Sequence, residues 1–220
     1  GYDNVFDYSL GNPSVPCPRD YTEEMIRLLR DEDPMAVHGY SPSLGIESVR
    51  RAVADSLNRR FGMDYEVKHI FMASGAAGAL AHAFRCVTAP GDEILTFAPY
   101  FPEYGPYVNL SGAVLKVVPA DTEEFQINFP ALEEMMNEKV MAVLINTPNN
   151  PSGAVCSAAT LEKLADFLKR KQIEYGHDVF LISDEPYREI VFQGTEPVYV
   201  SKFYDNTISC YSFSKSLSLP

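Results

Sequence analysis

Short apolar runs alternate with amphipathic segments along most of the chain. The apolar runs are HIFMA (69–73), EILTFA (93–98), AVLKVV (113–118), VMAVLIN (140–146), VFLIS (179–183) and TISCYS (207–212). Runs of this length, bounded by turn-forming residues, are typical of strands that are buried on both faces of a parallel sheet. Strands that alternate with helices predict an α/β fold with a mainly parallel sheet.

The segments between most of these strands have the three-to-four-residue spacing of helices. The predicted helices are residues 20–32, 45–62, 76–87, 130–138 and 157–176. The first of them is amphipathic, with its apolar side chains on one face: Met25, Ile26, Leu28 and Leu29. Gly62 and Gly176 close two of the others, as glycine commonly does at the end of a helix.

Turn-forming residues gather at HGYSPSLG, so we expect a domain boundary near residue 40. Both ends of the chain have the features of a cut. The chain begins at Gly1 rather than at Met, and it ends at Pro220 soon after a predicted strand. A domain seldom ends on an apolar strand that leads into a loop, so we expect the C-terminal part of the fold to be incomplete.

Composition narrows the classes of function. The chain has 18 Lys and Arg residues against 30 Asp and Glu residues, and its net charge of -12 repels nucleic acids and anionic lipids. No run approaches the roughly 20 apolar residues of a membrane span. The cysteines lack the spacing of a zinc site or a thiol redox motif; they are Cys17, Cys86, Cys156 and Cys210. These features predict a cytoplasmic protein with no nucleic-acid partner, no membrane partner and no metal ion.

Small or aromatic residues follow two of the predicted strands, at the edge where a parallel sheet binds its ligands. Residues 74–78 (SGAAG) open a helix, and their small side chains let backbone N–H groups and the helix dipole close on an anion such as phosphate. Residues 99–102 (PYFP) offer an aromatic ring that can lie on a planar heterocycle. Taken singly, the small residues are more often explained by tight packing at a turn, and a core aromatic beside a turn explains the ring at least as well.

The other strand ends supply an amide, a carboxylate and an amine. Asn150 lies in a turn-rich segment, where its amide can donate to a ligand oxygen. Asp184 ends an almost fully apolar strand. Burial of a charged carboxylate costs free energy unless a cation or a hydrogen-bond donor pairs with it. Tyr187 adds a phenol nearby, and Lys215 stands between hydroxyl-bearing residues. Turn chemistry alone explains the asparagine, and a single lysine is usually solvated.

Together the five strand ends describe a pocket for a phosphorylated pyridine aldehyde, and the sequence therefore predicts pyridoxal 5′-phosphate (PLP) as cofactor. The amine forms an imine with the aldehyde and moves protons at the α-carbon of the substrate. The carboxylate keeps the ring nitrogen protonated, so that the ring accepts electrons. Hydrogen bonds from the amide and the phenol to the ring 3′-oxygen favour its anionic form.

The motifs resemble those of the class I/II aminotransferases of PLP fold type I, the aspartate aminotransferase superfamily. Seven motifs occur in the order and at the spacing of that family: SLGNP, HGYSPSLG, SGAAGAL, APYFPEY, NTPNNPSG, SDEPY and SFSKSLSLP. The resemblance implies a three-layer large domain with a mainly parallel sheet at residues 41–220. It also implies that residues 1–40 form an N-terminal arm and helix that would pack with a small domain missing from this chain.

The resemblance implies a role for individual residues. Lys215 would form the Schiff base and act as the catalytic base, and Asp184 would pair with the pyridinium nitrogen. Asn150 and Tyr187 would hydrogen-bond the 3′-oxygen of the cofactor, and Phe101 would stack on its ring.

The phosphate group would be held by small residues at two strand ends. These residues are Gly75, Ala76, Ala77, Ser212 and Ser214. Positions 75–77 carry no hydroxyl, which departs from the family pattern, so binding there must use backbone donors. The family's arginine that closes the phosphate site would lie beyond residue 220.

Two further residues are implied outside this group. Tyr40, from the YSPSLG motif, would reach the phosphate of a neighbouring subunit, which implies a homodimer with shared active sites. Gly11, together with Asn150, would line the substrate side. The family's arginine that grips the substrate carboxylate lies in its small domain, which is missing here, so we expect little activity from these 220 residues alone.

The activity that the resemblance implies is transfer of an amino group from an L-amino acid to a 2-oxo acid. Aspartate, aromatic and branched-chain donors all stay open. The same motifs also fit a PLP-dependent C–S β-lyase, and the same fold serves as the effector-binding domain of some transcription regulators. A nucleotide-binding α/β domain is disfavoured, because no GxGxxG or GxxxxGK[ST] turn follows a strand.

Overall fold

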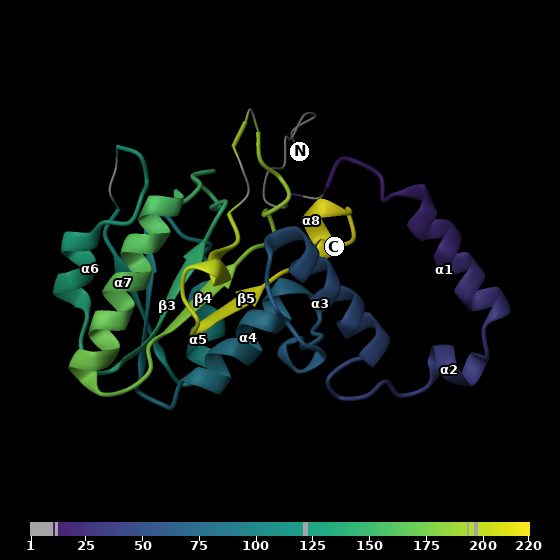
Figure 1. Ribbon diagram of the computed structural model, residues 1–220, viewed down its shortest axis with the longest axis horizontal. Coiled ribbons are helices and arrows are strands. Elements are labelled where there is room, and N and C mark those ends of the chain that lie inside the picture. Colours follow the sequence, from purple (N-terminus) through teal and green to yellow (C-terminus); the bar gives the residue numbers. More distant parts are fainter. Residues whose placement is uncertain (1–10, 12, 121–122, 193, 196–197) are drawn as a thin grey trace, which may run out of the picture.

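A parallel sheet forms the centre of the protein. In the computed structural model, which describes residues 11, 13–120, 123–192, 194–195 and 198–220, this sheet has five strands in the order β2-β1-β3-β4-β5 (Figure 1). The strands are β1 (Glu93–Phe97), β2 (Val114–Val118), β3 (Val140–Asn146), β4 (Phe180–Asp184) and β5 (Thr207–Cys210). Every neighbouring pair is parallel. The predicted α/β fold with a mainly parallel sheet is confirmed.

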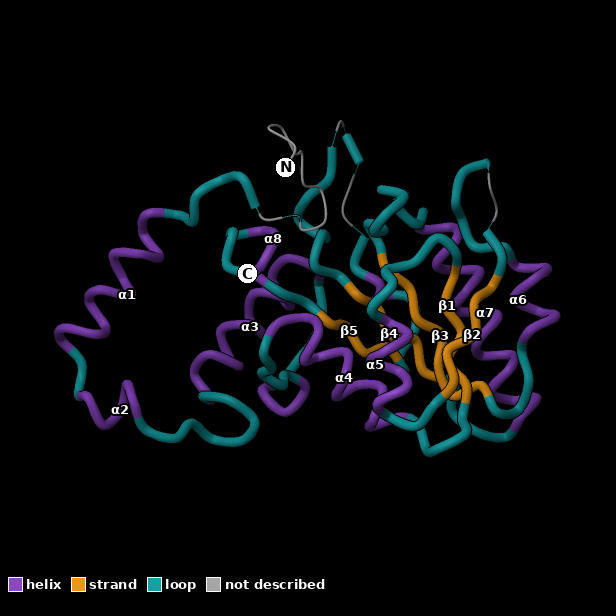
Figure 2. The backbone as a smooth tube through the Cα atoms, turned by 180° about the vertical axis from the view of Figure 1, so that it is seen from behind, coloured by secondary structure: helices purple, strands orange, loops and turns teal. Residues whose placement is uncertain are grey.

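Helices cover both faces of the sheet (Figures 1 and 2). On one face lie α4 (Gly75–Val87) and α5 (Tyr104–Leu110), and on the other lie α6 (Phe129–Met135) and α7 (Ala158–Tyr175). Successive residues of β1 enter opposite cores. Ile94 packs with the α4 and α5 side and Leu95 packs with the α6 and α7 side, and both are fully buried. This two-sided burial explains why the strands are almost continuously apolar.

Helix α7 has clear sequence signals at both ends. The side chain of Ser157 accepts a hydrogen bond from the Thr160 amide at 3.0 Å, which caps the first turn. Gly176 adopts the left-handed conformation with φ of 72°, which glycine takes without steric cost. Leu161, Leu164 and other apolar residues of this helix are buried against the sheet.

The N-terminal helices lie to one side of the sheet (Figure 1). They are α1 (Arg19–Asp31) and α2 (Pro34–His38), and α3 (Glu47–Phe61) lies between them and the sheet. Helix α1 has no buried residue, and its apolar side chains Met25, Ile26 and Leu29 are exposed. Among the described helices, none is both long and apolar enough to cross a bilayer.

The predicted strand at residues 69–73 is wrong. His69 ends a short 3-10 helix, η1 (Val67–His69), and the following residues form no strand. Phe71 is 52% exposed and Met72 is 37% exposed. A strand needs a neighbour to satisfy its backbone groups, and no strand of the described sheet pairs with this segment. The apolar pattern was therefore insufficient by itself.

Two more 3-10 or short helical segments follow β4 and β5. They are η2 (Val200–Lys202) and α8 (Phe213–Ser216). The run TISCYS was predicted as a strand over 207–212, and the strand ends at Cys210. Helices α2 and α5 were not predicted; in α5, Gly105 and Pro106 hide the helical pattern.

Candidate active site

The carboxyl ends of β3 and β4 are joined by side-chain hydrogen bonds. Asn146, the last residue of β3, donates from Nδ2 to the Asp184 carbonyl at 2.8 Å. The Asn150 amide donates to Asn146 Oδ1 at 2.6 Å, and Asn150 Nδ2 donates to the Tyr187 hydroxyl at 3.3 Å. The structure thus brings Asn150 and Tyr187 together above the ends of two neighbouring strands.

Asp184 is a buried carboxylate with one oxygen in use. It is 5% exposed, and its Oδ2 accepts a hydrogen bond from the Tyr104 hydroxyl at 2.6 Å. Its Oδ1 is buried and has no hydrogen-bond partner among the described residues. Burial raises the pKa of Asp184 to about 6, the Tyr104 hydrogen bond opposes this rise, and the nearby Glu185 adds to it. A buried acceptor with nothing bound to it fits a cationic N–H donor from outside the protein.

Tyr104 is a site residue that the sequence reasoning missed. It opens α5 and is 1% exposed, and burial, followed by the neighbouring Asp184 carboxylate, raises the pKa of its phenol. The ring of Phe101 packs edge-on against that of Tyr104, with centroids 5.6 Å apart. The signal was present in APYFPEY, where the tyrosine stands one helical turn beyond Phe101.

The start of α4 and the segment after β5 lie next to each other. Gly75 has φ of 68°, and a Cβ at this position would lie 3.9 Å from Ser212 Oγ. No side chain caps α4, so the amides of Ala76 and Ala77 keep no side-chain acceptor, whereas the Gly75 amide donates to the Ala73 carbonyl at 3.0 Å. Ser212 Oγ accepts from the Ser214 amide at 3.0 Å and donates to Ser214 Oγ at 2.8 Å. The five predicted phosphate residues therefore form one group.

Lys215 lies in α8, the four-residue helix that follows β5. The register pairs Asp184 of β4 with Cys210 of β5, so the segment that carries Lys215 leaves the sheet at the same edge as Asp184 and Tyr187. Lys215 is half-buried. The carboxylate thus lies at the end of β4, and the lysine lies in the segment that follows the adjacent parallel strand β5.

Two predicted site residues stand apart from this group. Tyr40 is fully exposed in the loop between α2 and α3. Gly11 is exposed, and a Cβ there would meet no atom within 4 Å. Its neighbours Leu10 and Asn12 lie outside the described residues. The roles of Tyr40 and Gly11 stay predictions.

A family model described as aminotransferase class I and II matches residues 3–220. The chain belongs to this family. A probable aspartate/prephenate aminotransferase of Aquifex aeolicus is 33% identical over 98% of this chain and 54% of its own length. An aspartate aminotransferase of Thermotoga maritima is 31% identical over 99% of this chain and 56% of its own length.

Solved structures of aminotransferases have the same fold. The crystal structure of an amino transferase from Eubacterium rectale is 50% identical, has a TM-score of 0.96, and is matched over 99% of this chain and 55% of that chain. An aromatic aminotransferase from Pyrococcus horikoshii has a TM-score of 0.87 at 27% identity, over 100% of this chain and 57% of that one. The chain thus spans about half the length of the aminotransferases that it matches.

Loss of the Tyr104 hydroxyl is expected to shift the pH dependence of stability. In Tyr104→Phe the Asp184 carboxylate loses its donor, which costs roughly 1–3 kcal/mol when the carboxylate is charged. Burial already raises the pKa of Asp184 in the folded protein from its ordinary value near 4 to about 6. The free energy of unfolding therefore falls as the pH rises from about 4 to 6. In the variant that pKa rises further, and the loss grows at pH 8 relative to pH 5.

Urea unfolding of the cofactor-free, full-length protein at both pH values measures this effect. Tyr107→Phe is the matched control, because Tyr107 lies on the same helix and donates to the exposed Glu103. Equal destabilisation of Tyr104→Phe at pH 5 and pH 8 would contradict the assignment.

Proposed function

We propose that the protein is a PLP-dependent aminotransferase that moves an amino group from an L-amino acid to a 2-oxo acid, and that this chain supplies its cofactor-binding residues. The observation that carries the proposal is the buried Asp184 carboxylate, whose Oδ1 lacks a partner among the described residues and lies at the same sheet edge as Lys215. The family uses PLP, which when bound supplies a ring that withdraws electrons from the α-carbon of the substrate.

The residues at this edge fit the chemical groups of PLP. Asp184 would hold the proton on the pyridine nitrogen through Oδ1, because that atom is buried and has no partner in the described part of the chain. Asn150 and Tyr187, which are already joined by a hydrogen bond, would bind the 3′-oxygen. Phe101 would cover one face of the ring. Each of these side chains would orient the cofactor.

The phosphate group would lie at the start of α4. Ala76 and Ala77 lie in the first turn of α4, where the positive end of the helix dipole favours an anion, and the Gly75 amide, which donates to the Ala73 carbonyl, would have to exchange that partner for the phosphate. The Ser212 hydroxyl lies beside Gly75 and donates to Ser214 Oγ, so the Ser214 hydroxyl would add a donor to the phosphate. The structure therefore supports phosphate binding by backbone amides and a serine hydroxyl, as the hydroxyl-free sequence at 75–77 requires.

Lys215 would do two things with one nitrogen atom. Its amine would hold the cofactor at the aldehyde carbon. Once the amino group of the substrate occupies that carbon, the released lysine amine would accept the proton from the substrate α-carbon and later donate it again. The buried carboxylate at the end of β4 and the half-buried amine beyond the end of β5 are suitably placed for these two roles of Lys215. Gly11 and Asn150 would lie on the substrate side of the ring.

We also propose a homodimer in which Tyr40 of one subunit reaches the phosphate group in the other. Tyr40 is fully exposed, and α1 presents apolar side chains that the described residues leave uncovered. Both features suit surfaces that other parts of an assembly cover. The division into an N-terminal arm at 1–40 and a large domain at 41–220 belongs to the same proposal.

Spectroscopy of single half-reactions tests the proposed activity. The full-length protein is loaded with PLP and mixed with one amino acid, without oxo acid. An aminotransferase leaves the cofactor in its amine form with one equivalent of 2-oxo acid, whereas release of ammonia and pyruvate from a cysteine conjugate would mean a β-lyase. A protein that binds no PLP would contradict both.

Substitution of Gly75 is expected to weaken cofactor binding. At φ of 68° a Cβ atom is strained by roughly 1–2 kcal/mol, although the space around Gly75 is open enough for it. In Gly75→Ala the backbone therefore moves away from this conformation, and the affinity for PLP falls about tenfold. Titration of the cofactor against its visible absorption measures the change.

Gly78→Ala is the control for this experiment, because Gly78 lies in the same helix at ordinary φ, and its added Cβ meets only normal contacts at 3.6 and 3.8 Å. Equal affinities for Gly75→Ala and Gly78→Ala would remove the argument for phosphate binding at this turn.

A further inference from the structure

A buried ion pair lies next to Asp184, in the segment that follows β4. Arg188 Nη1 donates to Glu185 Oε2 at 2.8 Å, and the two side chains are 4% and 1% exposed. The other carboxylate oxygen of Glu185 accepts from Ser209 Oγ on β5 at 3.0 Å. The Glu185 amide also donates to the Cys210 carbonyl at 2.8 Å. Glu185 thus ties the end of β4 to the end of β5.

The guanidinium of Arg188 lies among three aromatic rings. Its central carbon is 4.4 Å from the ring centroid of Tyr211 and 5.2 Å from the centroids of Phe61 and Tyr199. The rings of Phe61 and Tyr199 are stacked at 4.6 Å. These rings come from α3, from the residue before η2, and from the segment after β5. The guanidinium thus lies beside the stacked pair of Phe61 and Tyr199 and closest to the ring of Tyr211, and these cation–π contacts help to hold it in place.

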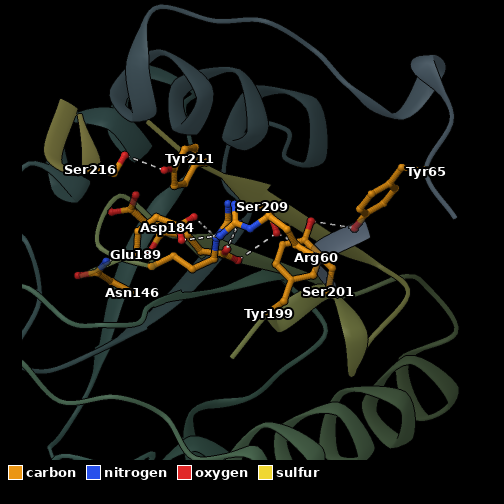
Figure 3. A network of polar contacts seen from close by, with 12 residues as sticks. Arg60, Tyr65, Asn146, Asp184, Glu189, Tyr199, Ser201, Ser209, Tyr211 and Ser216 are labelled. Carbon is orange, nitrogen blue, oxygen red and sulfur yellow. Dashed lines mark hydrogen bonds and ion pairs between the residues drawn. The ribbon is translucent and has the colours of Figure 1, made fainter. Parts of the chain in front are cut away.

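The ring of Tyr211 continues this network to the lysine segment. The Tyr211 hydroxyl and Ser216 Oγ lie 2.8 Å apart (Figure 3). Ser216 is the last residue of α8 and directly follows Lys215. A line of contacts therefore runs from Glu185 through Arg188 and Tyr211 to the residue beside the amine.

Stability alone gives a poor account of this network. A buried ion pair is often no more stabilising than apolar residues of the same size, because both charges must leave water. The surrounding charges also balance, since Arg188 Nε lies 3.4 Å from Glu189 and Arg60 pairs with the same carboxylate (Figure 3). The network instead fixes the orientation of the segments that it joins. Helix α8 has only four residues, and so short a helix depends on contacts with the rest of the protein.

We propose that Arg188 is a positioning residue, which acts through Tyr211 and Ser216 to fix the turn that carries Lys215 relative to Asp184 and Tyr187. This inference rests on the proposed PLP-dependent function. Asp184 directly precedes Glu185, and Tyr187 directly precedes Arg188, so one ion pair sets the place of the carboxylate, the phenol and the amine together.

Variants of the full-length protein with PLP test the network one bond at a time. Tyr211→Phe keeps the ring against Arg188 and removes only the hydroxyl, and Ser216→Ala removes the other partner of the same hydrogen bond. Each is expected to lower kcat about five- to tenfold, the effect of one lost hydrogen bond, with little change in KM. Each also shifts the pH midpoint of the visible absorption of the bound cofactor by about half a unit.

The double variant and two Arg188 variants separate positioning from a general loss of structure. Tyr211→Phe with Ser216→Ala should equal either single variant, because both remove the same bond. Arg188→Met should shift the pH midpoint of the visible absorption in the same direction as Tyr211→Phe. Arg188→Lys, which keeps the charge, should shift the midpoint less than Arg188→Met. Tyr199→Phe is the matched control: it keeps a ring beside Arg188 and loses a hydroxyl that bonds Tyr65 rather than Ser216.

Amide hydrogen exchange of the cofactor-free protein gives a readout that needs no catalysis. Residues 211–217 should exchange faster in Tyr211→Phe and Arg188→Met than in Tyr199→Phe. Additive effects in the double variant, or an absorption midpoint that stays unchanged in Tyr211→Phe, would overturn the positioning role while leaving the proposed function intact. A wild-type protein with no visible cofactor band would overturn both.

Discussion

Lys215→Ala is expected to abolish turnover and the covalent attachment of PLP, while the fold persists. The side chain lies in a four-residue helix and is half-buried, so truncation leaves the two hydrophobic cores untouched. Loss of the group that binds the cofactor and moves the proton removes the proposed chemistry at two points. We expect kcat to fall by at least about 10³-fold, as for the loss of a nucleophile or general base.

Borohydride reduction followed by peptide mass spectrometry measures this attachment directly. In the wild-type protein the reduced cofactor should be found on the peptide that contains Lys215, and in the variant no lysine should carry it. Lys202→Ala, at an exposed lysine of η2, serves as control. A reducible visible band that survives in Lys215→Ala would overturn the central assignment.

Asp184→Asn is expected to lower the catalytic activity of the protein with PLP and to stabilise the cofactor-free protein. The amide cannot hold the proton on the pyridine nitrogen, and breaking a buried charge pair costs roughly 3–5 kcal/mol. This corresponds to a loss in kcat/KM of about 10² to 10⁴-fold. Affinity for PLP should fall by a smaller factor, because the phosphate group keeps its own contacts.

The same substitution should stabilise the cofactor-free protein above pH 6. The pKa of Asp184 is raised from its ordinary value near 4 to about 6, chiefly by burial. Such a group contributes most at low pH and destabilises the folded state once it is charged, by about 3 kcal/mol for a shift of two units. The amide of the Asp184→Asn variant cannot ionise, so the difference in unfolding free energy between variant and wild type should appear between pH 4 and 6 and stay constant above pH 6.

Urea unfolding of the cofactor-free protein at pH 4, 6 and 8 checks this prediction. Asp178→Asn is a suitable control, because Asp178 is an exposed carboxylate near the start of the same strand. If Asp184→Asn were no more stable than wild type at pH 8, burial of the ionised Asp184 carboxylate would not destabilise the folded protein, and the prediction would be wrong.

The sheet and the long helix could be predicted from the sequence because each depends on a local pattern. Strands β3 and β4 are apolar at successive positions since helices bury both faces, and α7 carries a serine cap and a terminal glycine. The run at 69–73 has the same apolar pattern and forms no strand, because pairing is a property of two segments and the sequence of one cannot report it.

Motifs at the strand ends allowed the positions of Asp184 and Lys215 in the fold to be predicted from the sequence, and the roles of both residues stay predictions. The site was not predictable where a side chain arrives from another element. Tyr104 reaches Asp184 from α5, and Phe61 reaches Arg188 from α3. Nothing in the spacing of these residues reveals such contacts, since they depend on how helices pack on the sheet. For the same reason, the Asp184 oxygen that has no partner among the described residues became visible only in three dimensions.

Strand β5 forms one edge of the sheet in the described part of the chain, and this has a consequence for handling the protein. The backbone groups on the outer side of an edge strand are a template for strand addition by a second molecule. The net charge of -12 keeps molecules apart at low ionic strength, and added salt screens that repulsion. A preparation of these 220 residues alone is therefore expected to self-associate as salt is raised, so that poor colloidal behaviour in a crystallisation buffer would report the open edge rather than a misfolded core.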